Sequence, residues 1–340
     1  MQFSDFCDYV RENIGDYLPE YTDVEAELRN TTKNNGVELR SLCVRDENMN
    51  DYGSNIYLEY YYREYMEKMS IEKIMEEIAE EYRNSREKIL ETGLSVQDFT
   101  EPEVDRIVPR LVNYERNKEM LAKCPHIVYQ DLAVTFRMVG RVTERDMMSV
   151  LVDDRMLAKL GKTPQELYHT AVENYNRVFP PTLVSLGSVL SGLLGGAPDF
   201  MMDDSPEKSI YVLSNQQNIN GATTLLCNEM MDKAVQEIGG SFYVLPSSTH
   251  EVLLVPESFA QQAEDLASMV YEINRAVVNE MDFLSDTVYH YDAETRTLTM
   301  VNPPESLTKD LEESRSEDHS LEEDAPDLDD LDDPPFKVGR

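Results

Sequence analysis

The sequence predicts an α+β protein, with mainly antiparallel sheets that carry helices on one face and a disordered acidic C-terminal tail. Alternating polar and apolar segments flank tight-turn residues, a pattern typical of antiparallel hairpins. The order of segments in the second half is β-α-β-β-α-β-β, which favours an antiparallel sheet covered by helices. Hydrophobic residues make up 41% of the 340 residues, so a sizeable core can form.

The charge balance restricts the classes of partner. The chain has 66 acidic and 31 basic residues, a formal net charge of −35. Such a surface repels phosphate backbones and anionic lipid headgroups, so we expect no nucleic-acid and no membrane partner. No apolar run reaches about 18 residues, and the first residues lack a signal-peptide pattern. The four cysteines show no CxxC spacing, which is typical of free thiols in a cytoplasmic protein.

The first 123 residues predict helices around one hairpin. Apolar residues at helical spacing between Phe3 and Ile14 indicate an opening helix. Alternation over residues 24–29 and 37–40, joined by Asn-Asn-Gly, predicts a hairpin because Asn-Gly adopts the positive φ angles of a tight turn. A tyrosine-rich helix follows, and then a helix that Ser70 caps. Packing in the core explains most of these tyrosines better than a partner surface does. Residues 101–123 are a further helix candidate.

The rest of the folded chain alternates strands and helices. Residues 125–139 are strand-like, and Thr163 with Pro164 begins a helix that runs to about residue 179. We expect an apolar helix over 182–194 and a linker over 196–208. Strands are then expected at 210–213, 242–245, 251–255, 287–291 and 297–301, with helices at 224–238 and 259–278. The buried face of the second helix is expected to carry Ala263, Leu266, Met269, Val270 and Ile273.

Three regions follow from this pattern: an N-terminal α+β region over 1–123, a C-terminal α+β domain over 124–302, and a tail over 303–340. The tail contains fourteen acidic and four basic residues and therefore carries −10. It has few large apolar residues, so burial cannot offset the entropy of ordering it. We predict that the tail is disordered.

No catalytic, cofactor or metal signature stands out. The sequence from His250 begins like HExxH, but its fifth residue is Leu254, and the apolar run that follows indicates a strand. SxxK occurs four times without the partner motifs of serine acyl-transferases, so it indicates only capping serines. Walker, GxGxxG and GxSxG motifs are absent. We therefore expect no cofactor, no metal and no assigned catalytic residue.

The stretch from Pro246 to Glu251 resembles a site more than any other. It joins two expected strands and combines hydroxyl, imidazole and carboxylate groups, and Asn215 lies in an amide-rich loop after another strand. Polar turn residues alone explain such a loop, as helix capping explains the amides. The weak binding candidates are Ser247, Ser248, His250, Glu251 and Asn215.

A family resemblance rests on several short segments. They are Lys33–Leu39, Arg110–Asn117, Asp131–Val134, Tyr211–Asn215 and Leu245–Leu253. Through them the chain resembles an uncharacterised bacterial family, a domain of unknown function common in anaerobic gut Firmicutes (Clostridia), over residues 1–300. Its C-terminal half is similar, more distantly, to a second uncharacterised Gram-positive family. The resemblance implies a fold, a bacterial origin and a cytoplasmic setting, without an activity.

Three functional hypotheses remain open. The leading one is a non-enzymatic cytoplasmic protein that binds another protein through its C-terminal sheet or its tyrosine-rich helices. The alternative is a hydrolase-type enzyme that uses Ser247, Ser248 and His250, which requires these side chains to converge within about 3.2 Å. The third is an acidic mimic of nucleic acid. The oligomeric state does not follow from the sequence.

Overall fold

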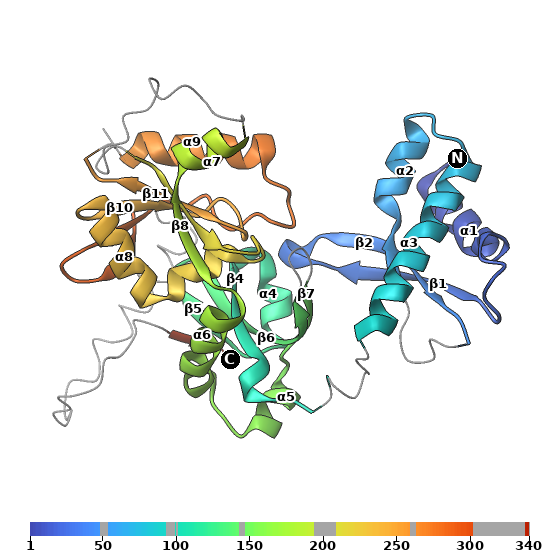
Figure 1. Ribbon diagram of the computed structural model, residues 1–340, viewed down its shortest axis with the longest axis horizontal. Helices are drawn as coiled ribbons and strands as arrows, with labels where there is room; N and C mark the ends of the chain where they lie inside the picture. The colour runs from blue at the N-terminus through green and yellow to red at the C-terminus, as the bar shows by residue number, and fades with distance from the viewer. Residues whose placement is uncertain are drawn as a thin grey trace, which may run out of the picture. The chain divides into compact units, whose positions relative to one another are not determined.

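The computed structural model describes residues 1–47, 54–92, 99, 101–142, 147–193, 209–258, 263–301 and 337–339. The chain forms two compact units, Met1–Glu101 and Pro102–Arg340 (Figure 1). The unit boundary therefore comes earlier than the predicted one at 123/124. The difference arises because residues 107–113 form a strand that pairs with the strand from Leu132 to Val142 in the second unit.

Where the structure describes it, the first unit is a three-stranded antiparallel sheet with three α-helices. Its elements are α1 (Phe3–Asn13), η1 (Ile14–Tyr17), β1 (Glu25–Thr32), η2 (Asn34–Gly36), β2 (Glu38–Arg45), β3 (Ser54–Tyr57), α2 (Leu58–Met66) and α3 (Ile71–Thr92). The predicted hairpin is confirmed: β1 pairs with β2, and Asn35 and Gly36 have φ angles of 62° and 70° at the turn. The tyrosines of α2 divide between inside and outside, since Tyr61 is buried with the core while Tyr60 is exposed.

The second unit contains two sheets. The five-stranded sheet consists of β4 (Ile107–Asn113), β5 (His126–Tyr129), β6 (Leu132–Val142), β7 (Met147–Leu151) and β14 (Lys337–Gly339). The six-stranded sheet has the order β13-β12-β10-β11-β9-β8. Its strands are β8 (Pro181–Ser185), β9 (Tyr211–Asn215), β10 (Phe242–Leu245), β11 (Val252–Pro256), β12 (Tyr289–Asp292) and β13 (Thr297–Met300). Every described pairing is antiparallel, so the predicted α+β class is confirmed.

Helices and short 3₁₀ turns complete this unit. They are η4 (Val104–Arg106), η5 (Glu115–Asn117), α4 (Lys118–Leu121), α5 (Asp154–Leu160), α6 (Pro164–Val178), α7 (Leu186–Leu193), η7 (Gly221–Leu226), α8 (Asn228–Ile238) and α9 (Ala263–Val277). The predicted start of α6 is confirmed, because Thr163 forms a capping box with Glu166 and Pro164 is the first helical residue. Figure 1 shows α9 running across the six-stranded sheet, where Val270 packs against Leu245, Val255 and Val288.

Two helix predictions were wrong in part. Residues 101–123 contain β4, because the apolar residues on either side of the partly buried Arg110 are buried on both faces of an edge strand, and Pro109 is tolerated at a sheet edge. Residues 181–185 form β8 before α7 begins. Short apolar runs fit a strand as well as a helix, so periodicity alone does not separate them.

Several expectations fall outside the described residues. They include the linker predicted over 196–208 and most of the tail over 303–340. Of that tail, only Lys337–Gly339 is described, as β14 paired with β5. None of the helices among the described residues is long and apolar enough to cross a membrane.

A buried carboxylate links the two sheets of the second unit. Asp131, at the turn between β5 and β6, is only 4% exposed. Its Oδ2 accepts hydrogen bonds from Ser285 Oγ at 2.5 Å and Thr287 Oγ1 at 2.8 Å, and its Oδ1 accepts one from the Tyr289 hydroxyl. Burial and the adjacent carboxylate raise the pKa of Tyr289 well above its usual value. The hydroxyl therefore stays a donor.

We predict that Asp131→Ala lowers the free energy of unfolding by about 3 kcal/mol, because three buried hydroxyls lose their acceptor. Urea unfolding followed by circular dichroism measures the change. Asp154→Ala, at an exposed position on α5, serves as the matched control. A loss below about 0.5 kcal/mol, the usual range for surface substitutions, would contradict a linking role for Asp131.

Candidate functional site

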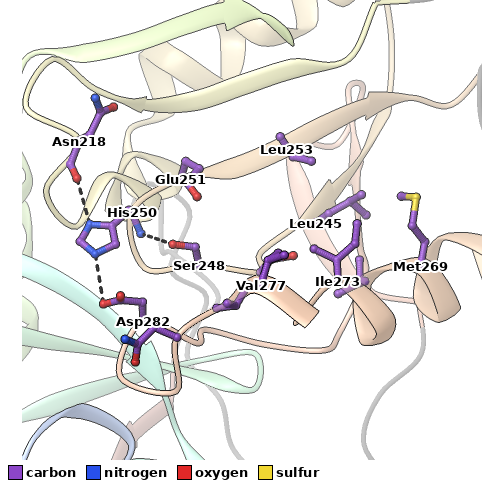
Figure 2. A pocket seen from close by; sticks show the side chains of 14 residues that line it. Asn218, Leu245, Ser248, His250, Glu251, Leu253, Met269, Ile273, Val277 and Asp282 are labelled. Carbon is purple, nitrogen blue, oxygen red and sulfur yellow. Dashed lines mark hydrogen bonds and ion pairs between the residues drawn. The ribbon is translucent and has the colours of Figure 1, made fainter. Parts of the chain in front are cut away.

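A pocket of about 580 Å³ lies between α9, strands β10 and β11, and the loops that follow them. One wall is apolar: Met269, Ile273 and Val277 of α9 face Leu245 and Leu253 of the two strands (Figure 2). The other end is polar and contains Asn218, Ser247, Ser248, His250, Glu251, Asn279 and Asp282. The pocket can therefore accept an apolar group with a polar group beside it.

The apolar wall comes from a helix face that the sequence assigned to the core. Met269 and Ile273 were expected to be buried, yet they are 37% and 39% exposed, and Val277 is 77% exposed. The three residues follow one another at four-residue spacing, so they form one stripe along α9. Val270, on the neighbouring side of the helix, makes the contact with the sheet. The expectation was wrong because periodicity places residues on a face without showing what covers it.

The imidazole of His250 is hydrogen-bonded at both nitrogens. Nδ1 lies 2.9 Å from the backbone oxygen of Asn218, and Nε2 lies 3.2 Å from Oδ1 of Asp282 (Figure 2). Both partners are acceptors, so the imidazolium form, which has two N–H donors, satisfies both bonds. The hydrogen bond to Asp282 raises the pKa of His250, while burial opposes it. The same bond lowers the pKa of Asp282.

Ser248 does not approach this imidazole as a nucleophile would. Its Oγ accepts a hydrogen bond from the backbone N–H of His250 at 3.0 Å, which is the polar turn expected of a short loop. A general base needs an unprotonated nitrogen directed at the hydroxyl. Both ring nitrogens of His250 face other oxygens. The geometry therefore holds the loop together and does not activate Ser248.

The loop is fixed by backbone pairing to a segment far along the chain. Thr249 N donates to Asp282 O at 2.7 Å, Leu284 N to Ser247 O at 3.1 Å and Ser285 N to Pro246 O at 2.9 Å. An isolated bridge pairs Ser248 with Phe283. These bonds join the β10–β11 connection to the segment before β12, so the polar end of the pocket is a rigid surface.

A close approach at Gly221 completes the support beneath His250. Ser214 Oγ donates to the His250 backbone oxygen at 2.7 Å. A Cβ at Gly221 would lie 2.1 Å from that Oγ and 2.2 Å from that backbone oxygen. Only glycine fits beside this hydrogen bond.

Asn215, one of the predicted binding candidates, is buried and supports the loop after β9. Its amide nitrogen donates to the Tyr175 hydroxyl and to Ile219 O, both at 2.8 Å. Its Oδ1 accepts from the backbone N–H groups of Gln217 and Ile219. Both polar atoms of this side chain are therefore hydrogen-bonded to the loop or to α6, so Asn215 supports the structure of the loop.

The other candidates line the pocket. Ser247, Ser248, His250 and Glu251 all contribute to its wall. Glu251 forms no hydrogen bond or ion pair with a described residue, so its carboxylate is available to a ligand. Asn218 belongs to the amide-rich loop that the sequence indicated, whereas Asp282 and the exposed stripe on α9 were not predicted. Asp282 is 32 residues from its partner His250, and a single sequence carries no signal of that pairing.

No group of three or more histidine, cysteine or acidic side chains among the described residues could hold a metal ion. Three of the four cysteines also differ from reactive thiols. Burial raises the pKa of Cys7 and of Cys124 to about 11, and that of Cys227 to about 12. At neutral pH these thiols are protonated and poor nucleophiles.

We predict that Gly221→Ala destabilises the protein by about 2–3 kcal/mol, because the added methyl group must displace Ser214 or the His250 backbone. Thermal unfolding measures the loss. Gly240→Ala is the matched control, because a Cβ at Gly240 meets nothing within 4 Å. Equal stability of the two variants would show that the approach at Gly221 is not tight.

The His250–Asp282 pair predicts a pH dependence of stability. The raised pKa of His250 contributes stability that is complete below its ordinary value of 6.5 and is lost as the pH rises through the higher folded value. The lowered pKa of Asp282 contributes stability that is present above its ordinary 3.8 and is lost as the pH falls through the lower folded value. The pair is therefore most stabilising between about pH 4 and pH 6.5.

Urea unfolding of the wild type and of His250→Gln at several pH values checks this dependence. We expect the stability difference between them to be larger at pH 5.5 than at pH 9. His169→Gln is the control, since His169 lies on α6 away from the pocket. A difference that grows with pH would contradict the imidazolium assignment.

Comparison with known proteins gives one match. No curated protein and no solved structure matches the chain. A family model does match, and it spans residues 3–293, which include nearly all of the first unit and the second unit as far as β12, with the pocket loop and α9. The matched region ends before the acidic tail. The chain therefore belongs to DUF5688, a family of unknown function.

Proposed function

We propose that the chain is a non-enzymatic binding protein whose pocket takes an apolar side chain from a protein partner, with a basic residue of that partner next to it. The main support for this proposal is the stripe formed by Met269, Ile273 and Val277, which is exposed to solvent. It faces a second apolar wall, formed by Leu245 and Leu253. Exposed apolar side chains that line a concave surface are typical of interaction sites.

Charge favours a basic partner over an acidic one. Glu251 and Asp282 bring two negative charges to the polar end, and the imidazolium of His250 offsets one of them. The whole chain carries −35, so its field attracts positively charged surfaces and speeds their approach. A lysine or arginine beside the buried apolar residue would pair with Glu251.

The hydrolase alternative loses its support, because Ser248 contacts the backbone N–H of His250 and the ring nitrogens are occupied by Asn218 and Asp282. A bacterial and cytoplasmic setting, expected from the sequence, belongs to the same proposal. So does the absence of a nucleic-acid partner, for which the net charge is the argument.

The test selects peptides from a random displayed library on the full chain and measures their affinity by fluorescence anisotropy. We expect the selected peptides to place an apolar residue next to lysine or arginine. Ile273→Asp should weaken their binding by at least tenfold, since it puts a charge where about 1.5–3 kcal/mol of apolar burial would occur.

Tyr271→Asp is the matched control. Tyr271 lies on the same helix and is 49% exposed, but it does not line the pocket, so this variant should bind the peptides as the wild type does. Selection of acidic peptides would contradict the proposal. So would equal binding to Ile273→Asp and to the wild type.

A further inference from the structure

Two arginines lie next to each other on one face of the five-stranded sheet. Arg110 of β4 is opposite Thr135 of β6, and Arg137 of β6 is opposite Val108 of β4. Residues opposite each other in an antiparallel pair lie on the same face of the sheet, and so do residues two positions apart along one strand. The two guanidinium groups are thus diagonal neighbours on adjacent strands, within reach of one shared ligand.

Arg137 is held in place by Ser149 of β7. Its Nε donates to Ser149 Oγ at 2.8 Å and its Nη2 donates to the Ser149 backbone oxygen at 3.1 Å. Both acceptors are neutral, so these bonds orient the guanidinium without cancelling its charge. The remaining N–H groups of Arg137 are left for another acceptor.

The Arg110 side chain has no hydrogen-bond partner among the described residues, and its Nε is fully enclosed by protein. Neither arginine forms an ion pair with a carboxylate of the described residues. An enclosed donor without an acceptor costs about 1–3 kcal/mol, and more when it is charged. Native structures rarely retain such a group without a use for it.

Among the carboxylates, Asp282 has the strongest electrostatic effect on Arg110, but it is hydrogen-bonded to another cationic group. Its Oδ1 accepts from His250 Nε2. Burial, and then the positive charge of Arg137, lower the pKa of Arg110 to about 10, while Asp282 acts in the opposite direction. The local balance at the two arginines remains positive inside a strongly acidic protein.

We propose that Arg110 and Arg137 form a binding site for a phosphate group of a small ligand. Two guanidinium groups match the two negative charges that a phosphate monoester carries at neutral pH. The terminal nitrogens of the two planar guanidinium groups can donate to different oxygens of the same phosphate, which a single ammonium group cannot do.

The acidity of the chain does not argue against this site. Exposed charges more than about 8–10 Å away are largely screened at physiological salt, whereas enclosed charges next to the ligand are not. The same acidity excludes a long phosphate backbone, because many of its charges would lie over the negative surface. A single phosphate group on a small molecule avoids that repulsion.

The test uses the full chain in a buffer free of phosphate and sulfate, with thermal unfolding as the readout. Inorganic phosphate, added at constant ionic strength, should raise the midpoint temperature of the wild type saturably. Acetate under the same conditions should not. Arg110→Gln should weaken the apparent phosphate affinity at least tenfold and should be no less stable than the wild type without phosphate, because it removes an enclosed, unpaired charge.

Arg155→Gln is the matched control, since the Arg155 side chain is 93% exposed on α5, and it should respond to phosphate as the wild type does. Ile273→Asp should also retain the phosphate response, so the proposals for the pocket and for the phosphate site are tested independently of each other. The proposal is overturned if the wild type shows no saturable response or if Arg110→Gln responds equally. A response to acetate as large as that to phosphate would overturn the assignment to phosphate.

Discussion

The segment from Asp282 to Tyr289 connects every part of the second unit that forms the pocket. It pairs with the β10–β11 connection through backbone bonds to Ser247 and Thr249. It also meets β4, where the Asn113 side chain donates to Leu284 O at 2.9 Å, and α9, where Asn274 donates to Ser285 O at 2.9 Å. Its hydroxyl groups satisfy the buried carboxylate of Asp131. Two sheets and a helix therefore share this one strand-like segment.

This arrangement explains why the two ends of the pocket differ. Apart from Glu251, the polar end is built largely from groups whose hydrogen bonds join the loops to each other, so it is held in one arrangement. The apolar wall on α9 is supported from behind by Val270 and the sheet, and its outer stripe has no cover among the described residues. A rigid polar end fixes the orientation of a ligand, while exposed apolar surface supplies the free energy of binding.

Much of the fold could be predicted because its signals are local. Asn35 and Gly36 specify the turn of the first hairpin, and Thr163 with Pro164 specifies the start of α6. The stretch from Pro246 to Glu251 was singled out because it combines hydroxyl, imidazole and carboxylate groups between two expected strands, and four of its residues line the pocket. The partners of that stretch could not be predicted. His250 meets Asp282 and Asn218 through tertiary pairing, and β4 was taken for a helix because a short segment of mostly buried residues fits either period.

The role of His250 separates a binding pocket from a catalytic one, and nitrogen-15 NMR of its ring tests that role most directly. The His250 signals are assigned by their loss in His250→Gln. At pH 6.5, the ordinary pKa of histidine, the account predicts that most molecules carry protons on both Nδ1 and Nε2. A ring that is mostly neutral at this pH, with a free lone pair on Nε2, would contradict the account and restore a general base to the site.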